Sequence, residues 1–161
     1  MEARLNLAPD GICDELREVR AEAFRAPVEG AFPHRLICRR LRHVSNSVGR
    51  DFPESAKRGM TNPAYMNPVD LEKLGVSAGD LVEIASAHDA ILAVVQPTDE
   101  VQSGVVSMAH CFGDALESDG DVHRLGSNTG RLIAEDRDYD PITGMAPQIA
   151  IPVAVRPSPP R

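Results

Sequence analysis

The stretch "MNPVDLEKLGVSAGDLVEIAS", residues 66–86, contains helix start and stop residues that predict a short helix leading directly into a strand. Asn67 is a good N-cap, Pro68 suits the first helical position, and Asp70 falls near the positive end of the helix. Gly75 is the expected left-handed stop, and "SAGD" then turns the chain into the strand. We therefore predict a short helix laid across the end of a β-barrel.

Five short apolar runs, each bounded by turn residues, predict strands. The runs are "HRLICRRL" (34–41), "DLVEIASA" (80–87), "AILAVVQ" (90–96), "GVVSMAH" (104–110) and "QIAIPVAV" (148–155). Strands of this length at such close spacing are typical of a barrel or a sandwich. Between Gly113 and Gly130 the chain is polar and rich in Asp, Gly and Ser, and a loop that long is usually functional or disordered.

An amphipathic helix is predicted at residues 10–25, ahead of the strands, with Asp10 as its N-cap. Its apolar stripe consists of Ile12, Leu16, Val19 and either Ala23 or Phe24. "RAPVEGAFP" then breaks the helix with two prolines and a glycine. We therefore expect a helical arm and linker at 1–31, a main domain at 32–156 and a Pro-rich tail at 157–161.

Composition limits the kind of core and the kind of partner. The 161 residues are about one domain long. Hydrophobic residues make up 42% and aromatic residues only 4%, so the core must be built from Val, Ile, Leu, Ala and Met. The formal net charge is −7, which argues against a nucleic-acid binder, because neutralising phosphates needs a basic surface.

The cysteines and the apolar runs bear on the compartment. Cys13, Cys38 and Cys111 are odd in number and far apart, so they fit neither a disulfide framework nor a CxxC metal knuckle. This favours a reducing compartment. No apolar run approaches the roughly 20 residues that a membrane span needs, and the N-terminus has no signal-peptide core. We expect a cytoplasmic chain without membrane insertion, or a piece of a longer protein whose targeting segment is missing.

The ordered motifs resemble a known family. "YMNPVDLEKLGVSAGDLVEIAS…AILAVVQPTDEVQSGVVSMAHCFG" is similar to the C-terminal molybdopterin dinucleotide-binding domain of the molybdenum and tungsten oxidoreductases. That superfamily includes formate dehydrogenases, nitrate reductases and dimethyl sulfoxide reductase. "FPHRLICRRLRHVSNSVGRD" and "GSNTGRLI…DYDPITGMAPQIAIPVAV" extend the resemblance, which covers about residues 32–156.

The resemblance implies a mainly-β fold, a six-stranded double-psi β-barrel with short helices. It also implies a molybdopterin guanine dinucleotide cofactor, whose molybdenum or tungsten is ligated by another domain. The partners would be the remaining domains of the parent oxidoreductase, which hold the iron–sulfur and metal sites. The chain is then an excised C-terminal domain or, less readily, a free-standing small subunit, and we expect no turnover from it in isolation.

A block of arginines is the first candidate for cofactor binding. Its members are Arg35, Arg39, Arg40, Arg42 and Arg50. The planar guanidinium fits phosphate oxygens, and the cofactor carries a pyrophosphate. In the loop "HVSNSVGRD", Asn46 and Ser47 offer short polar side chains and Gly49 permits close backbone approach. The alternative is a solvated strand face whose arginines pair with acidic residues.

Two further segments carry candidates. His110 and Phe112 in "MAHCFG" end an apolar strand, and the resemblance places this segment near the pterin; the alternative is a histidine that is merely hydrogen-bonded. Asn128 in "GSNTGRLI" has an amide that donates and accepts, as recognition of a pterin edge requires, with Thr129 and Arg131 beside it. The alternative there is an ordinary asparagine turn.

The resulting set of predicted cofactor-binding residues contains no catalytic residue and no metal ligand. Its members are Arg39, Arg40, Asn46, Ser47, Arg50, His110, Asn128 and Thr129. A joint metal role for His110 and Cys111 is disfavoured, because adjacent residues on a strand point to opposite faces. A different class of function remains open, in which the barrel has lost cofactor binding and serves as an interaction or structural module.

Overall fold

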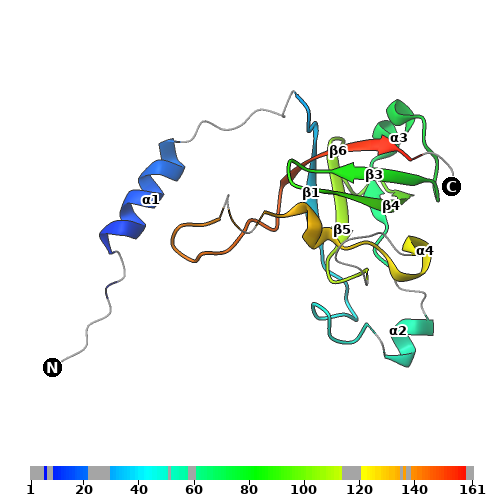
Figure 1. Cartoon of the computed structure of the whole chain (residues 1–161), viewed down its shortest axis with the longest axis horizontal. Helices are drawn as coiled ribbons and strands as arrows, with labels where there is room; N and C mark the ends of the chain where they lie inside the picture. Colours follow the sequence, from blue (N-terminus) through cyan, green and yellow to red (C-terminus); the bar gives the residue numbers. More distant parts are fainter. Residues whose placement is uncertain are drawn as a thin grey trace.

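The structure is a computed structural model that describes residues 6, 9–21, 30–50, 52–57, 61–113, 121–134, 136 and 139–158. Six strands close into a barrel in the order β1-β5-β2-β4-β3-β6 (Figure 1). They are β1 (His34–Arg39), β2 (Ala64–Met66), β3 (Leu81–Ala85), β4 (Ala90–Pro97), β5 (Val105–Ala109) and β6 (Ile151–Pro157). The predicted mainly-β, six-stranded barrel is confirmed.

Each of the five predicted runs contains a strand, but the ends differ. β6 begins at Ile151 rather than at Gln148, because Ala150 has a φ of 59° and a left-handed residue cannot continue a strand. β2 was not singled out by the sequence pattern, since three residues are too few to show an alternation. Two of the pairings, β1 with β5 and β2 with β4, are parallel.

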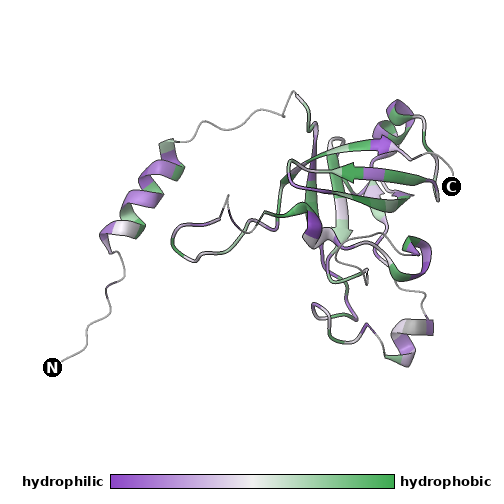
Figure 2. Ribbon diagram, in the orientation of Figure 1, coloured by the Kyte–Doolittle hydropathy of each residue, from purple (hydrophilic) through white to green (hydrophobic). Residues whose placement is uncertain are grey.

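Aliphatic side chains fill the barrel. Along β4 the burial alternates, so that Ile91, Ala93 and Val95 face inward. The core cluster consists of Leu, Ile, Val, Ala and Met side chains, as the composition predicted. Figure 2 shows the same contrast, with mainly hydrophobic strands in the barrel and mixed colours on the helices.

The stretch at 66–86 folds as its capping and turn residues predict. Helix α3 (Pro68–Leu74) starts at Asn67, whose side-chain oxygen accepts a hydrogen bond from the Val69 backbone N–H at 3.0 Å. It ends at Gly75, whose φ of 68° is left-handed and whose N–H reaches back to the last carbonyls. Leu71 is buried against the barrel core, so one face of this short helix covers the barrel.

Asp70 connects helix α3 to the turn that precedes β5 through side-chain hydrogen bonds. It is only 4% exposed, and its two carboxylate oxygens accept from the Ser103 hydroxyl and the Gly104 N–H, each at 2.6 Å. Burial alone raises the pKa of Asp70, but these hydrogen bonds and the Lys73 ammonium outweigh burial, and the net pKa lies below the usual 3.8. The folded chain therefore holds this carboxyl ionised.

The remaining helices are short or lie outside the barrel. They are α1 (Asp10–Ala21), α2 (Pro53–Lys57), α4 (Val122–Leu125) and the 3₁₀ helix η1 (Thr129–Leu132). α1 confirms the predicted first helix up to Ala21; Ala23 and Phe24 fall outside the described residues. α1 stands apart from the barrel and buries no residue (Figure 1). In the part of the chain that is described, no helix is long and apolar enough to cross a membrane.

The predicted loop between Gly113 and Gly130 is partly helical. α4 and the start of η1 both lie in it, and residues 114–120 fall outside the described part. Neither helix was predicted, because runs of four residues carry no measurable periodicity.

We predict that Asp70→Asn lowers the free energy of unfolding by about 2 kcal/mol at pH 7, because hydrogen bonds to a charged acceptor contribute roughly 1.5–3 kcal/mol. Since folding depresses the pKa of Asp70, its contribution is complete above about pH 5 and is lost as the pH falls through the folded pKa. The difference between wild type and variant should therefore shrink below about pH 4. Urea unfolding at several pH values measures it.

Glu72→Gln is the matched control, because Glu72 lies on the same helix but is exposed. It should leave stability within about 0.5 kcal/mol of wild type. An Asp70→Asn variant that is as stable as this control at pH 7 would show that the connection made by Asp70 is unimportant.

Candidate functional site

The parallel pairing of β1 and β5 gathers the candidate residues at one edge of the barrel. Cys38 lies opposite Met108 and Arg39 opposite Ala109, so the two strands end side by side. The segments that follow, 40–50 and 110–113, therefore leave the barrel together. Most of the predicted site residues lie in these two segments.

Arg40, Asn46 and His110 form a polar cluster at this edge. The Arg40 Nη1 donates to Asn46 Oδ1 at 2.8 Å. The Nε2 of His110 lies 3.1 Å from the same oxygen and 3.4 Å from Arg40 Nη1. Arg40 and Asn46 are exposed. The guanidinium has five N–H donors, and the amide oxygen occupies only part of them, so an anion has donors to bind.

The loop after β1 is a tight structure that presents Asn46 and Ser47 at a turn. Isolated bridges join Leu41 to Val44 and Ser45 to Val48. Asn46 has a φ of 53°, a left-handed conformation that asparagine tolerates better than most residues. Gly49 has a φ of 94°, and a Cβ there would lie 3.0 Å from the His43 carbonyl oxygen. The close approach at Gly49 is thus made by the loop's own backbone.

Arg50 braces this loop against the segment after β5. Its Nη1 donates to the Cys111 carbonyl at 2.9 Å. The same segment holds Phe112, which is 2% exposed. Arg50 therefore links the loop after β1 to the segment after β5.

The arginines of the predicted block make different contacts. Arg39 lies 4.3 Å over the Tyr65 ring and 3.5 Å from a Glu100 carboxylate oxygen. Arg35, near the start of β1, donates to the carbonyls of Phe32 and His34. Of the five, Arg40 is the one whose guanidinium meets Asn46 and His110.

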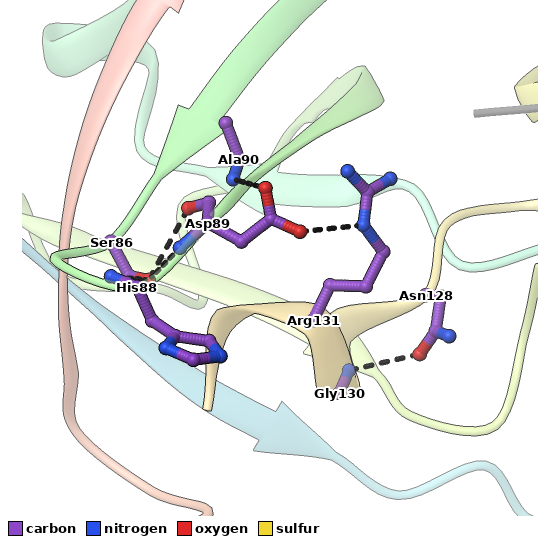
Figure 3. Close-up of polar contacts among 7 residues, drawn as sticks. All are labelled: Ser86, His88, Asp89, Ala90, Asn128, Gly130 and Arg131. Atoms are coloured by element: carbon purple, nitrogen blue, oxygen red, sulfur yellow. Dashed lines mark hydrogen bonds and ion pairs between the residues drawn. The ribbon is translucent and has the colours of Figure 1, made fainter. Parts of the chain in front are cut away.

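A third segment enters the site through helix η1. Asn128 caps η1, and its Oδ1 accepts from the Gly130 N–H at 3.0 Å (Figure 3). Thr129 is 6% exposed. The Arg131 Nε donates to Asp89 at 2.9 Å, which pins η1 to the turn between β3 and β4. The hydrogen bond from Arg131 lowers the pKa of Asp89 most, and a hydrogen bond from the Ala90 N–H lowers it further. Together they outweigh desolvation, which raises the pKa, so the pKa of Asp89 lies below its usual value.

These segments enclose a pocket of about 210 Å³. Its polar or polarisable lining includes Cys38, His110, Cys111, Asn128, Thr129 and Gln148, and its apolar lining includes Leu36, Met108, Ile133 and Ile151. His110, Asn128 and Thr129 were predicted; Cys38, Cys111 and Gln148 were not, because nothing in the sequence marked their side chains as ligands. Among the described residues, no group of three or more His, Cys, Asp and Glu is arranged to hold a metal ion.

Asn62 was not predicted as a site residue, and it holds the third segment, residues 126–130, in place. It is 2% exposed and uses its whole amide: Nδ2 donates to the carbonyls of Ala109 and Ser127, and Oδ1 accepts from the Ser127 N–H, all at 2.7 Å. Gly126 is packed tightly here, because a Cβ would lie 2.3 Å from Asn62 Oδ1. The backbone that carries Asn128 is thus fastened to the end of β5.

The fold and site define a closed β-barrel with a mixed polar and apolar pocket at the end of a parallel strand pair. Residues 35–151 match the family model described as "Molydopterin dinucleotide binding domain". The chain belongs to this family, as its ordered motifs predicted. A search of curated proteins found no match.

A solved structure shares the fold. The chain is similar to "Acetylene Hydratase from Pelobacter acetylenicus", with a TM-score of 0.64 and 14% sequence identity. The match covers 98% of this chain and 21% of that chain, so the present chain spans about a fifth of the length of that relative. At this identity the likeness supports the barrel architecture alone.

We predict that Gly126→Ala destabilises the chain by more than about 3 kcal/mol, because overpacking adds to the cost of a backbone conformation that non-glycine residues rarely adopt. Gly126 has a φ of 76° and a ψ of −163°. Gly144→Ala is the control, since Gly144 has a φ of 69° with nothing within 4 Å of a Cβ. It should cost only about 1–2 kcal/mol. Equal losses in thermal unfolding would show that the Asn62 contact adds nothing.

Proposed function

We propose that this chain binds a molybdopterin guanine dinucleotide at the edge formed by β1, β5 and η1, and orients it for a redox site built by other domains. The observation that carries the proposal is the meeting of Arg40, Asn46 and His110 beside the pocket lined by Asn128 and Thr129. Membership of the dinucleotide-binding family supports a molybdopterin-type cofactor; the guanine form belongs to the proposal.

The charge and polarity of the site suggest which residues would bind the pyrophosphate and which would bind the pterin. Arg40, with Asn46 and Ser47 beside it, suits the pyrophosphate, since a guanidinium offers paired donors to phosphate oxygens. Asn128 and Thr129, in a partly apolar pocket, suit the flat pterin, whose edge needs donors and acceptors. The cofactor supplies the redox chemistry through molybdenum or tungsten, while this chain binds and orients it.

The size of the pocket limits what it encloses. Sites that bury a drug-sized ligand measure roughly 300–1,000 Å³, whereas this pocket measures about 210 Å³. It therefore suits one end of a dinucleotide, and the rest would lie along the Arg40 loop or against another domain. Arg39 and Arg50, which already contact Glu100 and Cys111, would act by holding the edge in shape.

Exposed apolar side chains suggest where other domains would pack. On α1, Leu16 and Val19 are 62% and 53% exposed. Before β6, Tyr139, Met145 and Ile149 are exposed by more than half. We propose that the arm at 1–31 connects the 32–156 barrel to the metal-site and iron–sulfur domains of a cytoplasmic oxidoreductase, and that the isolated chain does not turn over substrate.

Cofactor content of the intact protein that carries this chain tests the proposal. Arg40→Ala and Asn128→Ala should each weaken binding about tenfold or more, because one lost charge-assisted or buried hydrogen bond costs roughly 1.5–3 kcal/mol. Pterin and guanine nucleotide, released from the purified protein and quantified, give the readout. Arg156→Ala is the control. Arg156 lies opposite Glu83 in the register of β6 and β3, on the part of β6 that continues past its pairing with β1.

Unchanged cofactor content in both variants would contradict the proposal and favour the interaction-module alternative. A second measurement needs no cofactor. Pyrophosphate added to the chain should shift backbone amide NMR signals within residues 38–50, and Arg40→Ala should suppress these shifts. A titration that moves no signal in this segment would also count against the phosphate site.

A further inference from the structure

The pocket also holds a thiol, Cys38, that cofactor binding does not use, and this thiol lies beside His110 and Asn46. We propose that Cys38 is a nucleophilic thiol that exchanges with small disulfides, that His110 accepts its proton, and that Asn46 positions the imidazole. The proposal goes beyond cofactor binding, because it assigns a covalent modification site to a residue with no role in holding a dinucleotide.

The three side chains are connected in the order that such chemistry needs. The Cys38 Sγ lies 3.0 Å from His110 Nδ1. On the other side of the ring, His110 Nε2 lies 3.1 Å from Asn46 Oδ1. A nucleophile, a base and a group that orients the base thus form one chain of contacts.

The contacts of Asn46 and Arg40 with His110 bear on which ring nitrogen carries the hydrogen. Asn46 Oδ1 accepts from Arg40 Nη1 at 2.8 Å, which identifies this atom as the oxygen, since an amide nitrogen would oppose a second donor. His110 Nε2 lies 3.1 Å from that oxygen and 3.4 Å from Arg40 Nη1, and because the contact with Asn46 is the shorter one, we assign the ring hydrogen to Nε2. With the hydrogen on Nε2, the Nδ1 lone pair is directed at the Cys38 thiol.

The backbone holds the thiol and the ring rigidly and leaves the thiol accessible. Cys38 sits in β1 with Met108 of β5 opposite, and His110 follows β5 by one residue. Cys38 is half-buried and lines the 210 Å³ pocket. A buried water occupies about 30 Å³, so the pocket has room for one half of a small disulfide.

The exchange balances without a further oxidant. The Cys38 S–H proton passes to His110 Nδ1 as the sulfur attacks one sulfur of the incoming disulfide. The new S–S bond joins Cys38 to that half, the old S–S bond breaks, and the departing thiolate takes the proton from His110. The products are a mixed disulfide on Cys38 and one free small thiol.

Hydroxyethyl disulfide, a small neutral probe that the Arg40 charge does not attract, tests the proposal on the full 161-residue chain. After reduction and removal of the reductant, mass mapping of peptides over time gives the exchange rate at each cysteine. Cys111 is the internal comparator, because it lines the same pocket. We expect Cys38 to react about tenfold faster than Cys111, since proton transfer to a positioned base contributes about that much or more.

Variants then test the role of the ring. His110→Gln should slow Cys38 about tenfold by removing the proton acceptor, and His123→Gln, an exposed change on α4, should leave the rate unchanged. Asn46→Ala should slow Cys38 in the same direction, whereas Asn46→Asp should retain the rate, because it keeps an oxygen acceptor for the Nε2 hydrogen. Circular dichroism verifies that each variant is folded.

Either of two results would overturn the proposal: equal rates at Cys38 and Cys111 in the wild type, or a folded His110→Gln variant that exchanges at the wild-type rate. If His110→Gln does not fold, the Asn46 pair decides, and equal rates in Asn46→Ala and Asn46→Asp would contradict a positioning role. Cofactor content is measured on the intact protein and the exchange rates on the chain without added cofactor, so the failure of one proposal is distinguishable from the failure of the other.

Discussion

The parallel pairing of β1 with β5 is the constraint on which the site depends. In a parallel pair both chains end at the same edge, whereas an antiparallel pair would send one of them to the far end of the barrel. Cys38 and His110, 72 positions apart in sequence, therefore come within 3.0 Å. The pairing is itself fixed by closure, since β1 is held between β5 and the antiparallel β6.

A second constraint, the hydrogen bonds of Asn62, holds the segment that carries Asn128 against the pocket. The amide of Asn62 bonds to the ends of two segments, one at Ala109 and one at Ser127. A buried amide that lost these partners would leave polar groups unsatisfied, which costs roughly 1–3 kcal/mol. The arrangement therefore tolerates little change around Gly126, and it keeps the pocket wall at a fixed distance from β5.

Local features were predictable from the sequence, and non-local ones only in part. The caps of α3 at Asn67 and Gly75 act within a few residues, so their chemistry can be read directly. The order of the family motifs gave the barrel, but not β2, whose three residues show no pattern. The arginine block looked continuous in sequence, yet strand geometry and a contact with Glu100 turn Arg39 toward Tyr65. Asn62 and Cys38 carried no signal, because their roles depend on partners distant in sequence.

The two proposals share His110 and Asn46, and this sharing has a physical consequence. A dinucleotide phosphate drawn to Arg40 would compete with Asn46 Oδ1 for the same guanidinium donors, and a pterin in the pocket would cover the Cys38 thiol. A group attached to Cys38 would in turn occupy space in a pocket of only about 210 Å³. Under the two proposals, cofactor binding and thiol exchange at this edge would therefore exclude each other, and the thiol would react with disulfides only while the cofactor is absent.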